Sequence, residues 1–182
     1  MSNAVLSVRH QRDTVGTVDP MTALDEAYVD TKAQGSSTAC ILTLVDDCVI
    51  GDSGFAVLRG GKIVYTSPPQ QSRFNCPVQL GKSCAAAEKF EVKVKPGDII
   101  VMAMDGLFDN VHESELEDLV NRSGSDEKPM KLARKIARYA LKNSLNRNID
   151  TPFSAATKIA GIDEHAIGGK YDDITVVVAY IQ

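Results

Sequence analysis

The chain has 182 residues, of which 43% are hydrophobic and 24% are charged, a length and composition typical of one globular domain with a sizeable core. No run approaches the roughly 18 to 20 apolar residues of a membrane-spanning helix. The 20 basic and 24 acidic residues give a formal net charge of -4, and no stretch of the chain forms a basic stripe. We therefore expect a single soluble domain over residues 1–182, without nucleic acid or a membrane as partner and with no indication of its oligomeric state.

The four cysteines, at positions 40, 48, 76 and 84, form no Cys-x-x-Cys pair. The N-terminal sequence "MSNAVLSVRHQR" places its basic residues after its short apolar stretch, which is not the order of a secretory signal. Reduced thiols in an intracellular protein are therefore the favoured interpretation. Plastid, mitochondrial and cytoplasmic locations all stay open.

The first half of the chain predicts one helix followed by hairpins. A helix is expected over Met21–Ala33, with Asp19 and Pro20 as its start signal. The runs "TACILTLV" and "CVIGDSGF" surround Asp46 and Asp47 and predict a hairpin. A second hairpin is expected where "FAVLR" and "KIVYT" flank Gly60–Gly61, since two glycines adopt positive φ easily in a tight turn.

The second half predicts a long loop, a central strand, two helices and a last strand. The loop spans Ser67–Ser83, which is rich in proline and polar residues. The run "IIVMAM" is apolar on both faces, as in a central strand. Helices are expected over "ESELEDLV" and Lys128–Leu145, and "ITVVVAYI" forms the last strand. Hairpins between blocks of helix indicate an α+β layered domain without internal repeats.

Carboxylates stand at the ends of three of these apolar strands. Asp52 follows "CVIG", Asp105 follows "IIVMAM", and Asp172 and Asp173 precede "ITVVVAYI". Adjacent strands would bring these side chains together. Carboxylates without nearby His or Cys form a hard oxygen site, which suits Mg²⁺ or Mn²⁺. Such ions bind phosphate oxygens and activate water, so the pattern points to metal-assisted hydrolysis of a phosphoester.

A purely structural interpretation competes at each position. An Asp at the end of a strand is more often a turn former or a helix cap than a metal ligand. Asp109, for example, is expected to cap the helix that follows it. Three coincidences at three strand ends favour the metal site without deciding it.

Five ordered blocks of the sequence resemble the type 2C, metal-dependent protein serine/threonine phosphatases (the PPM family). The blocks are "GSSTAC" (35–40), "GDSGF" (51–55), "QQSRFNCPVQL" (70–80), "DGLFDN" (105–110) and "GGKYDDITVVV" (168–178). The third block is similar to the branch that includes plant and mitochondrial members. Together the blocks extend the resemblance from Asp19 to the C-terminus.

The resemblance implies a fold in which two antiparallel β-sheets pack face to face with helices on the outside, an αββα sandwich. It also implies a manganese or magnesium centre whose activated water attacks phosphoserine or phosphothreonine in a phosphoprotein substrate, so that no side chain is assigned as the catalytic group. Asp105 resembles the ligand of the second metal, Asp172 the ligand before the last strand, and Asp52 the contributor to a third, weaker site. Asp173 stands where many members have Asn.

Other positions carry a structural role or depart from the family. Ser37 and Thr38 resemble residues that pack the strand behind the centre. Residues 1 to 34 contain no match to the family's Asp-Gly-x-Gly-Gly element, whose Asp bridges both metals. We therefore expect a family member that is incomplete at its N-terminus, that lacks its first metal-binding strands and exposes unpaired strand edges, and that binds a single metal weakly.

Two hypotheses about function follow. The first is a Mn²⁺/Mg²⁺-dependent protein serine/threonine phosphatase. The alternative is a non-catalytic phosphatase-like binding module, which would keep the fold and use the Ser67–Ser83 loop to engage a phosphoprotein or another partner.

Overall fold

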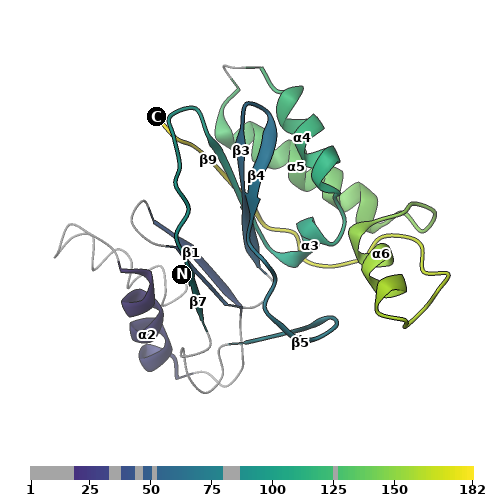
Figure 1. Ribbon diagram of the computed structural model, residues 1–182, viewed down its shortest axis with the longest axis horizontal. Coiled ribbons are helices and arrows are strands. Elements are labelled where there is room, and N and C mark those ends of the chain that lie inside the picture. Colours follow the sequence, from purple (N-terminus) through teal and green to yellow (C-terminus); the bar gives the residue numbers. More distant parts are fainter. Residues whose placement is uncertain (1–18, 33–37, 44–46, 51–52, 80–86, 125–126) are drawn as a thin grey trace. The chain divides into compact units, whose positions relative to one another are not determined.

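The computed structural model describes residues 19–32, 38–43, 47–50, 53–79, 87–124 and 127–182 (Figure 1). Within residues 47–50 it describes the backbone. The chain divides into two compact units, one formed by Met1–Ser53 with Pro69–Lys93 and the other by Gly54–Pro68 with Val94–Gln182. Each unit is described by itself, and the single-domain organisation stays a prediction.

The first unit contains one helix and two small antiparallel sheets. Helix α2 (Pro20–Asp30) begins where the sequence predicts, because the Asp19 side chain accepts a hydrogen bond from the Thr22 amide and Pro20 takes the first helical position. Its buried Leu24 packs against Ala39 and Ile41. The strands are β1 (Ala39–Leu42), β2 (Asp47–Ile50), β5 (Gln71–Arg73), β6 (Cys76–Pro77) and β7 (Glu88–Phe90), paired in the orders β1-β2-β7 and β5-β6.

Two predictions for this unit meet different outcomes. The first hairpin is confirmed, since β1 pairs antiparallel with β2, although Asp47 belongs to the strand rather than to the turn. The prediction of a long loop over Ser67–Ser83 is wrong for residues 71–77 and agrees with the absence of helix or strand at residues 67–70 and 78–79. Residues 71–77 form the β5-β6 hairpin, and its turn contains Asn75 with a positive φ of 52°.

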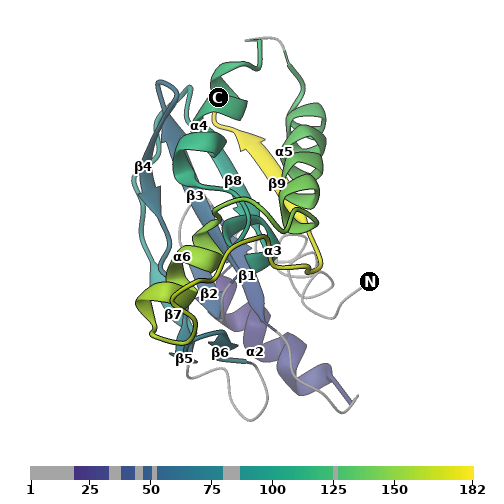
Figure 2. The ribbon, with the colours of Figure 1, turned by 90° about the vertical axis from the view of Figure 1, so that its right-hand side faces the viewer.

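The second unit is built on a four-stranded antiparallel sheet. Its strands are β3 (Gly54–Arg59), β4 (Lys62–Thr66), β8 (Ile99–Ala103) and β9 (Val176–Tyr180), in the order β4-β3-β8-β9 (Figure 2). The Gly60–Gly61 turn has the predicted positive φ values, 57° and 77°. Strand β8 pairs with β3 on one side and β9 on the other, so it is central, as its apolar sequence predicts. The α+β class with antiparallel sheets is confirmed.

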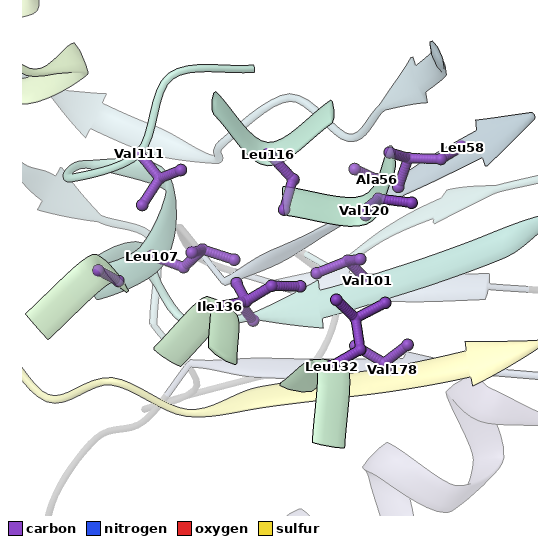
Figure 3. Packing of buried hydrophobic residues seen from close by; sticks show 12 residues of the cluster. Ala56, Leu58, Val101, Leu107, Val111, Leu116, Val120, Leu132, Ile136 and Val178 are labelled. Atoms are coloured by element: carbon purple, nitrogen blue, oxygen red, sulfur yellow. The ribbon is translucent and has the colours of Figure 1, made fainter. Parts of the chain in front are cut away.

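Four helices accompany this sheet: α3 (Asp105–Phe108), α4 (Glu113–Asn121), α5 (Pro129–Ser144) and α6 (Pro152–Ile159). The core forms where α4 and α5 cover one face of the sheet (Figure 3). Leu132 and Ile136 of α5 are fully buried there beside Val101 and Val178 of the sheet. Burying each of these side chains contributes about 1.5–3 kcal/mol, so α5 is fixed firmly on the sheet.

The exposed face of α5 carries a group of basic residues, although no stretch of the linear sequence forms a basic stripe. Five basic residues of this helix are exposed: Lys131, Arg134, Lys135, Arg138 and Lys142. Helical periodicity places them on one side, which the linear sequence does not show. Glu127 forms ion pairs with Lys131 and Lys135. The hydrogen bond from Lys135, followed by that from Ser123, is the main cause that lowers the pKa of Glu127 to about 2. The absence of a nucleic-acid partner stays a prediction.

No helix in the described part of the chain is long and apolar enough to cross a membrane.

A buried carboxylate ties together three segments at one end of the four-stranded sheet. Asp98, at 1% exposure, accepts two hydrogen bonds from the Arg59 guanidinium, at 2.8 and 2.7 Å, and one from the Lys95 amide. Its carbonyl oxygen accepts the Ile181 amide just after β9. The bond from Arg59 is the largest cause that holds the pKa of Asp98 below its ordinary value.

We expect Asp98→Asn to lower the free energy of unfolding at pH 7 by about 2–4 kcal/mol, because Arg59 loses its buried partner. A carboxyl group with a lowered folded-state pKa stabilises the fold above its unfolded pKa of about 3.9, and this stabilisation is lost as the pH falls through the folded pKa. The difference between parent and variant should therefore shrink below about pH 4. Urea denaturation between pH 7 and pH 3 measures it.

The control is Asp118→Asn, since Asp118 forms an exposed ion pair with Arg122 at 3.6 Å. That change should cost less than about 1 kcal/mol at every pH. Equal losses in the two variants at pH 7 would contradict the role given to Asp98.

Candidate functional site

The turn from β8 into α3 positions two carboxylates on one side of a short helix. Strand β8 ends at Ala103, Met104 is the N-cap, and Asp105 is the first residue of α3. Asp109 follows one turn later as the C-cap, and its amide donates to the Asp105 carbonyl at 2.7 Å. Residues four apart lie on the same helix face. The two side chains therefore point into the same region, just beyond the end of β8.

The segment before β9 lies directly against this helix because glycines permit it. A Cβ atom at Gly106 would collide with the Asp173 carbonyl oxygen, and a Cβ atom at Gly169 would collide with the Asn143 carbonyl oxygen. Gly168 has a φ of 101°, a region that side chains disfavour. The backbone around residues 168–173 can thus approach α3 and the end of α5 closely enough to bring Asp172 to the site.

A fully buried amide then fixes the position of Lys170. The Asn110 side chain, at 0% exposure, donates to the carbonyl oxygens of Gly106 and Lys170, each at 2.9 Å. Its own oxygen accepts the Lys170 amide at 2.9 Å, while Asn143 donates to the Asn110 carbonyl. Both backbone polar groups of Lys170 are therefore held by one side chain, which lies two residues after the end of α3.

The Lys170 ammonium lies among three carboxylates. Nζ is 2.7 Å from Asp105 Oδ2, 2.7 Å from Asp109 Oδ2 and 3.2 Å from Asp172 Oδ2. It also lies 5.4 Å from the centre of the Phe153 ring, a cation–π distance. The lysine side chain is 16% exposed. A single positive charge is thus enclosed by three negative ones at the edge of the sheet.

The surroundings act on the charge of Lys170 in opposite directions. Burial, the largest single effect, lowers the pKa of its ammonium. Hydrogen bonds to Asp105 and Asp109, together with their negative charges, outweigh burial and raise the pKa above its ordinary value. Lys170 is therefore positively charged at neutral pH.

The strand-end carboxylates meet different outcomes. Asp105 and Asp172 lie around the same ammonium, as expected for residues at the adjoining ends of the paired strands β8 and β9. Asp52, the third predicted ligand, lies outside the described residues. Asp173 is exposed, and its amide donates to Asp172 Oδ1. The prediction that Asp109 caps the helix after it is wrong, because Asp109 is the C-cap of α3 and His112 is the N-cap of α4. The ion pair of Asp109 with Lys170 was not predicted.

Lys170 and Asn110 are site residues that the sequence did not predict. The sequence offers one signal for each residue. Lys170 is the single basic residue in "GGKYDD", and Asn110 is an amide residue directly after Asp109. Of the two residues expected to pack behind the centre, Ser37 lies outside the described residues. Thr38 forms a hydrogen bond between its hydroxyl group and that of Ser53 at 3.1 Å.

Comparisons with known proteins identify the family of the chain. The family model described as protein phosphatase 2C matches residues 88–149. The chain is 42% identical over 193 aligned residues to the probable protein phosphatase 2C 55 of Arabidopsis thaliana, with all of this chain aligned to 40% of that protein. The chain belongs to the protein phosphatase 2C family.

Solved structures support the same family fold. The X-ray structure of the photosystem II phosphatase PBCP matches with a TM-score of 0.85 and 28% identity, over 100% of this chain and 77% of that one. The catalytic domain of the protein phosphatase PstP, crystallised with two manganese ions, matches with a TM-score of 0.62 and 17% identity, over 98% of this chain and 79% of that one. The chain thus spans less than half of the Arabidopsis relative but most of each solved domain.

The donor set of this phosphatase 2C chain fits a hard divalent cation in chemistry. Carboxylate oxygens are the ligands that Mg²⁺ and Mn²⁺ prefer, and Asp105 and Asp172 already surround a cation, the Lys170 ammonium. Among the residues whose placement is described, no three Asp, Glu, His or Cys side chains gather into a metal-binding group by themselves. The carboxylates are instead arranged around the ammonium.

Replacing the buried amide tests the architecture of the site. We expect Asn110→Ala to lower the free energy of unfolding by about 2–4 kcal/mol, because the Gly106 and Lys170 carbonyls and the Lys170 amide all lose a buried partner. Chemical denaturation measures the loss. The matched control is Asn148→Ala at an exposed position, for which a change within about 0.5 kcal/mol is expected. Equal stability of the two variants would refute the role given to the Asn110 side chain in holding Gly106 and Lys170.

Proposed function

We propose that the protein is a Mn²⁺/Mg²⁺-dependent protein phosphatase that hydrolyses phosphoserine and phosphothreonine in phosphoproteins. The observation that supports this most is the convergence of Asp105 and Asp172 on one cation position in a chain of the phosphatase 2C family. The two carboxylates come from residues 67 positions apart in sequence. A purely local role as turn formers does not require them to meet.

In this proposal Asp105 and Asp172 hold the metal, and Asp52 contributes to a further, weaker site. A bound divalent ion lowers the pKa of water and neutralises phosphate oxygens, which supplies a nucleophile at neutral pH. The protein's part is to fix the ligands. Asp105 is fixed by its place at the start of α3, where its Oδ1 accepts the Gly106 amide. Asp172 is fixed by the close approach of its segment to Gly106. It is also fixed by the hydrogen bonds of the Asn110 side chain to the backbone of Lys170, two residues before Asp172.

The charge of the described cluster supports a weakly bound single metal. Three carboxylates and one ammonium leave two negative charges, which one divalent ion would balance. A second ion close by would add repulsion that these residues alone do not offset. The bridging aspartate of the family's Asp-Gly-x-Gly-Gly element, which residues 1 to 34 do not contain, would supply the missing charge.

The alternative, a non-catalytic binding module, draws support from one feature of the site. The Lys170 ammonium forms ion pairs with Asp105 and Asp109, so the protein itself supplies a positive charge to these carboxylates. In that case phosphoproteins or other partners would be held without being hydrolysed.

The deciding experiment is Mn²⁺-dependent phosphate release from a phosphothreonine peptide by the purified 182-residue chain. We expect release by the parent and a loss of at least about a hundredfold in Asp105→Ala, because the variant lacks a ligand whose contribution is several kcal/mol. Asp118→Ala, an exposed carboxylate on α4, is the control and should leave the rate within about twofold of the parent.

Circular dichroism of each sample establishes that it is folded. Release that survives Asp105→Ala would refute the assignment of the site. A folded parent without release would instead favour the binding module.

A further inference from the structure

We propose that Lys170 is a resident counter-ion that competes with the metal: its ammonium holds Asp105 and Asp172 together without metal, and transfers to Asp109 when a divalent ion binds. Lys170 thereby sets the metal concentration at which the site fills. This inference rests on the metal use in the proposed function and concerns a residue to which the family resemblance gives no role.

The Lys170 ammonium lies between the two proposed metal ligands. The ammonium contacts one oxygen of each carboxylate, at 2.7 Å from Asp105 and 3.2 Å from Asp172. These distances are those of direct ion pairs, so the ammonium lies where a cation shared by these two ligands would lie. A lysine ammonium and a divalent ion cannot occupy that position together, because they repel each other and require the same oxygen atoms.

The backbone of Lys170 is fixed, whereas its side chain can rotate. Asn110 binds both the amide and the carbonyl oxygen of Lys170, at 2.9 Å each, and the Gly169 amide donates to the Asn146 carbonyl at 2.8 Å. The main chain at this point is thus fixed on both sides. The four-carbon side chain keeps its rotatable bonds, so the ammonium can move by a few ångströms while its attachment stays in place.

Asp109 gives the Lys170 ammonium a further carboxylate partner within the site. Asp109 also binds the ammonium at 2.7 Å, lies one helical turn after Asp105, and is not among the predicted metal ligands. Transfer toward Asp109 would leave Asp105 and Asp172 for a metal and keep the lysine paired. The nearby Phe153 ring, 5.4 Å from the ammonium, gives the cation a further favourable neighbour on the protein side of the site.

The test is calorimetric titration of the 182-residue chain with MnCl₂, comparing the parent with Lys170→Met and Lys158→Met. Lys158 is the matched control, because it forms an ion pair with one exposed carboxylate, Asp150, at 3.0 Å. We expect Lys170→Met to bind Mn²⁺ at least about tenfold more tightly than the parent, since a competing unit charge is removed. Lys158→Met should match the parent.

A second readout requires no metal. In EDTA, Lys170→Met should melt at a lower temperature than the parent, because three carboxylates then face one another without a cation. Saturating Mn²⁺ should raise its melting temperature by more than it raises that of the parent. If the methionine variant does not fold in EDTA, Lys170→Gln and refolding in the presence of Mn²⁺ give the same comparison.

The part played by Asp109 follows from a double-mutant cycle. Asp109→Asn should weaken Mn²⁺ binding in the parent, where the displaced ammonium loses its second partner, by a larger factor than in Lys170→Met, where no ammonium needs it. Equal factors in both backgrounds would reduce Asp109 to a general electrostatic effect and overturn the proposed transfer.

The outcomes separate this inference from the proposed function. Equal or weaker Mn²⁺ binding by Lys170→Met overturns the competition, and so does a failure of all the chains to bind Mn²⁺, whatever the hydrolysis assay shows. Tighter Mn²⁺ binding by Lys170→Met, together with no phosphate release by the folded parent, would support the competition between Lys170 and the metal. It would contradict the phosphatase assignment.

Discussion

Like charges gathered in a small volume require a compensating charge, and this constraint governs the end of the sheet where β8 and β9 meet α3. Asp105, Asp109 and Asp172 all face one ammonium. Without it, their mutual repulsion would push the segment around residues 168–173 away from α3. Lys170 therefore supports the architecture of the site in the absence of metal. The same contacts restrict the access of any other cation to Asp105 and Asp172, so stability and metal affinity are opposed at this point.

The rest of the second unit provides a rigid support for this cluster. Helix α5 is fixed on the sheet by buried Leu132 and Ile136 (Figure 3), and its end carries Asn143, which holds the Asn110 carbonyl. The apolar core is thus connected to the polar site through two buried amides. At the other end of the sheet the bidentate pair of Arg59 and Asp98 closes the strands. Polar groups thus fix both ends of a sheet whose middle is apolar.

The sequence predicted those parts of the molecule that local chemistry determines. The Gly60–Gly61 hairpin, the start of α2 at Asp19 and the meeting of Asp105 with Asp172 all follow from turn geometry, capping and strand ends. Helix α3 was missed because four residues are too short for a periodic pattern, and α6 was missed although Thr151 and Pro152 form a start signal. The position of Lys170 could not be predicted, since it depends on a close approach between segments 60 residues apart. The basic face of α5 appears only when the helix is formed.

The glycines at positions 106 and 169 make contacts that no other residue could make, and these contacts involve backbone atoms alone. At each of these positions a Cβ atom would meet a carbonyl oxygen, so the close approach depends on the absence of a side chain there. A substitution at either glycine would therefore displace the carboxylates and the lysine without changing the charge of any of them. The site can be lost through its backbone alone, with every charged side chain still in the sequence.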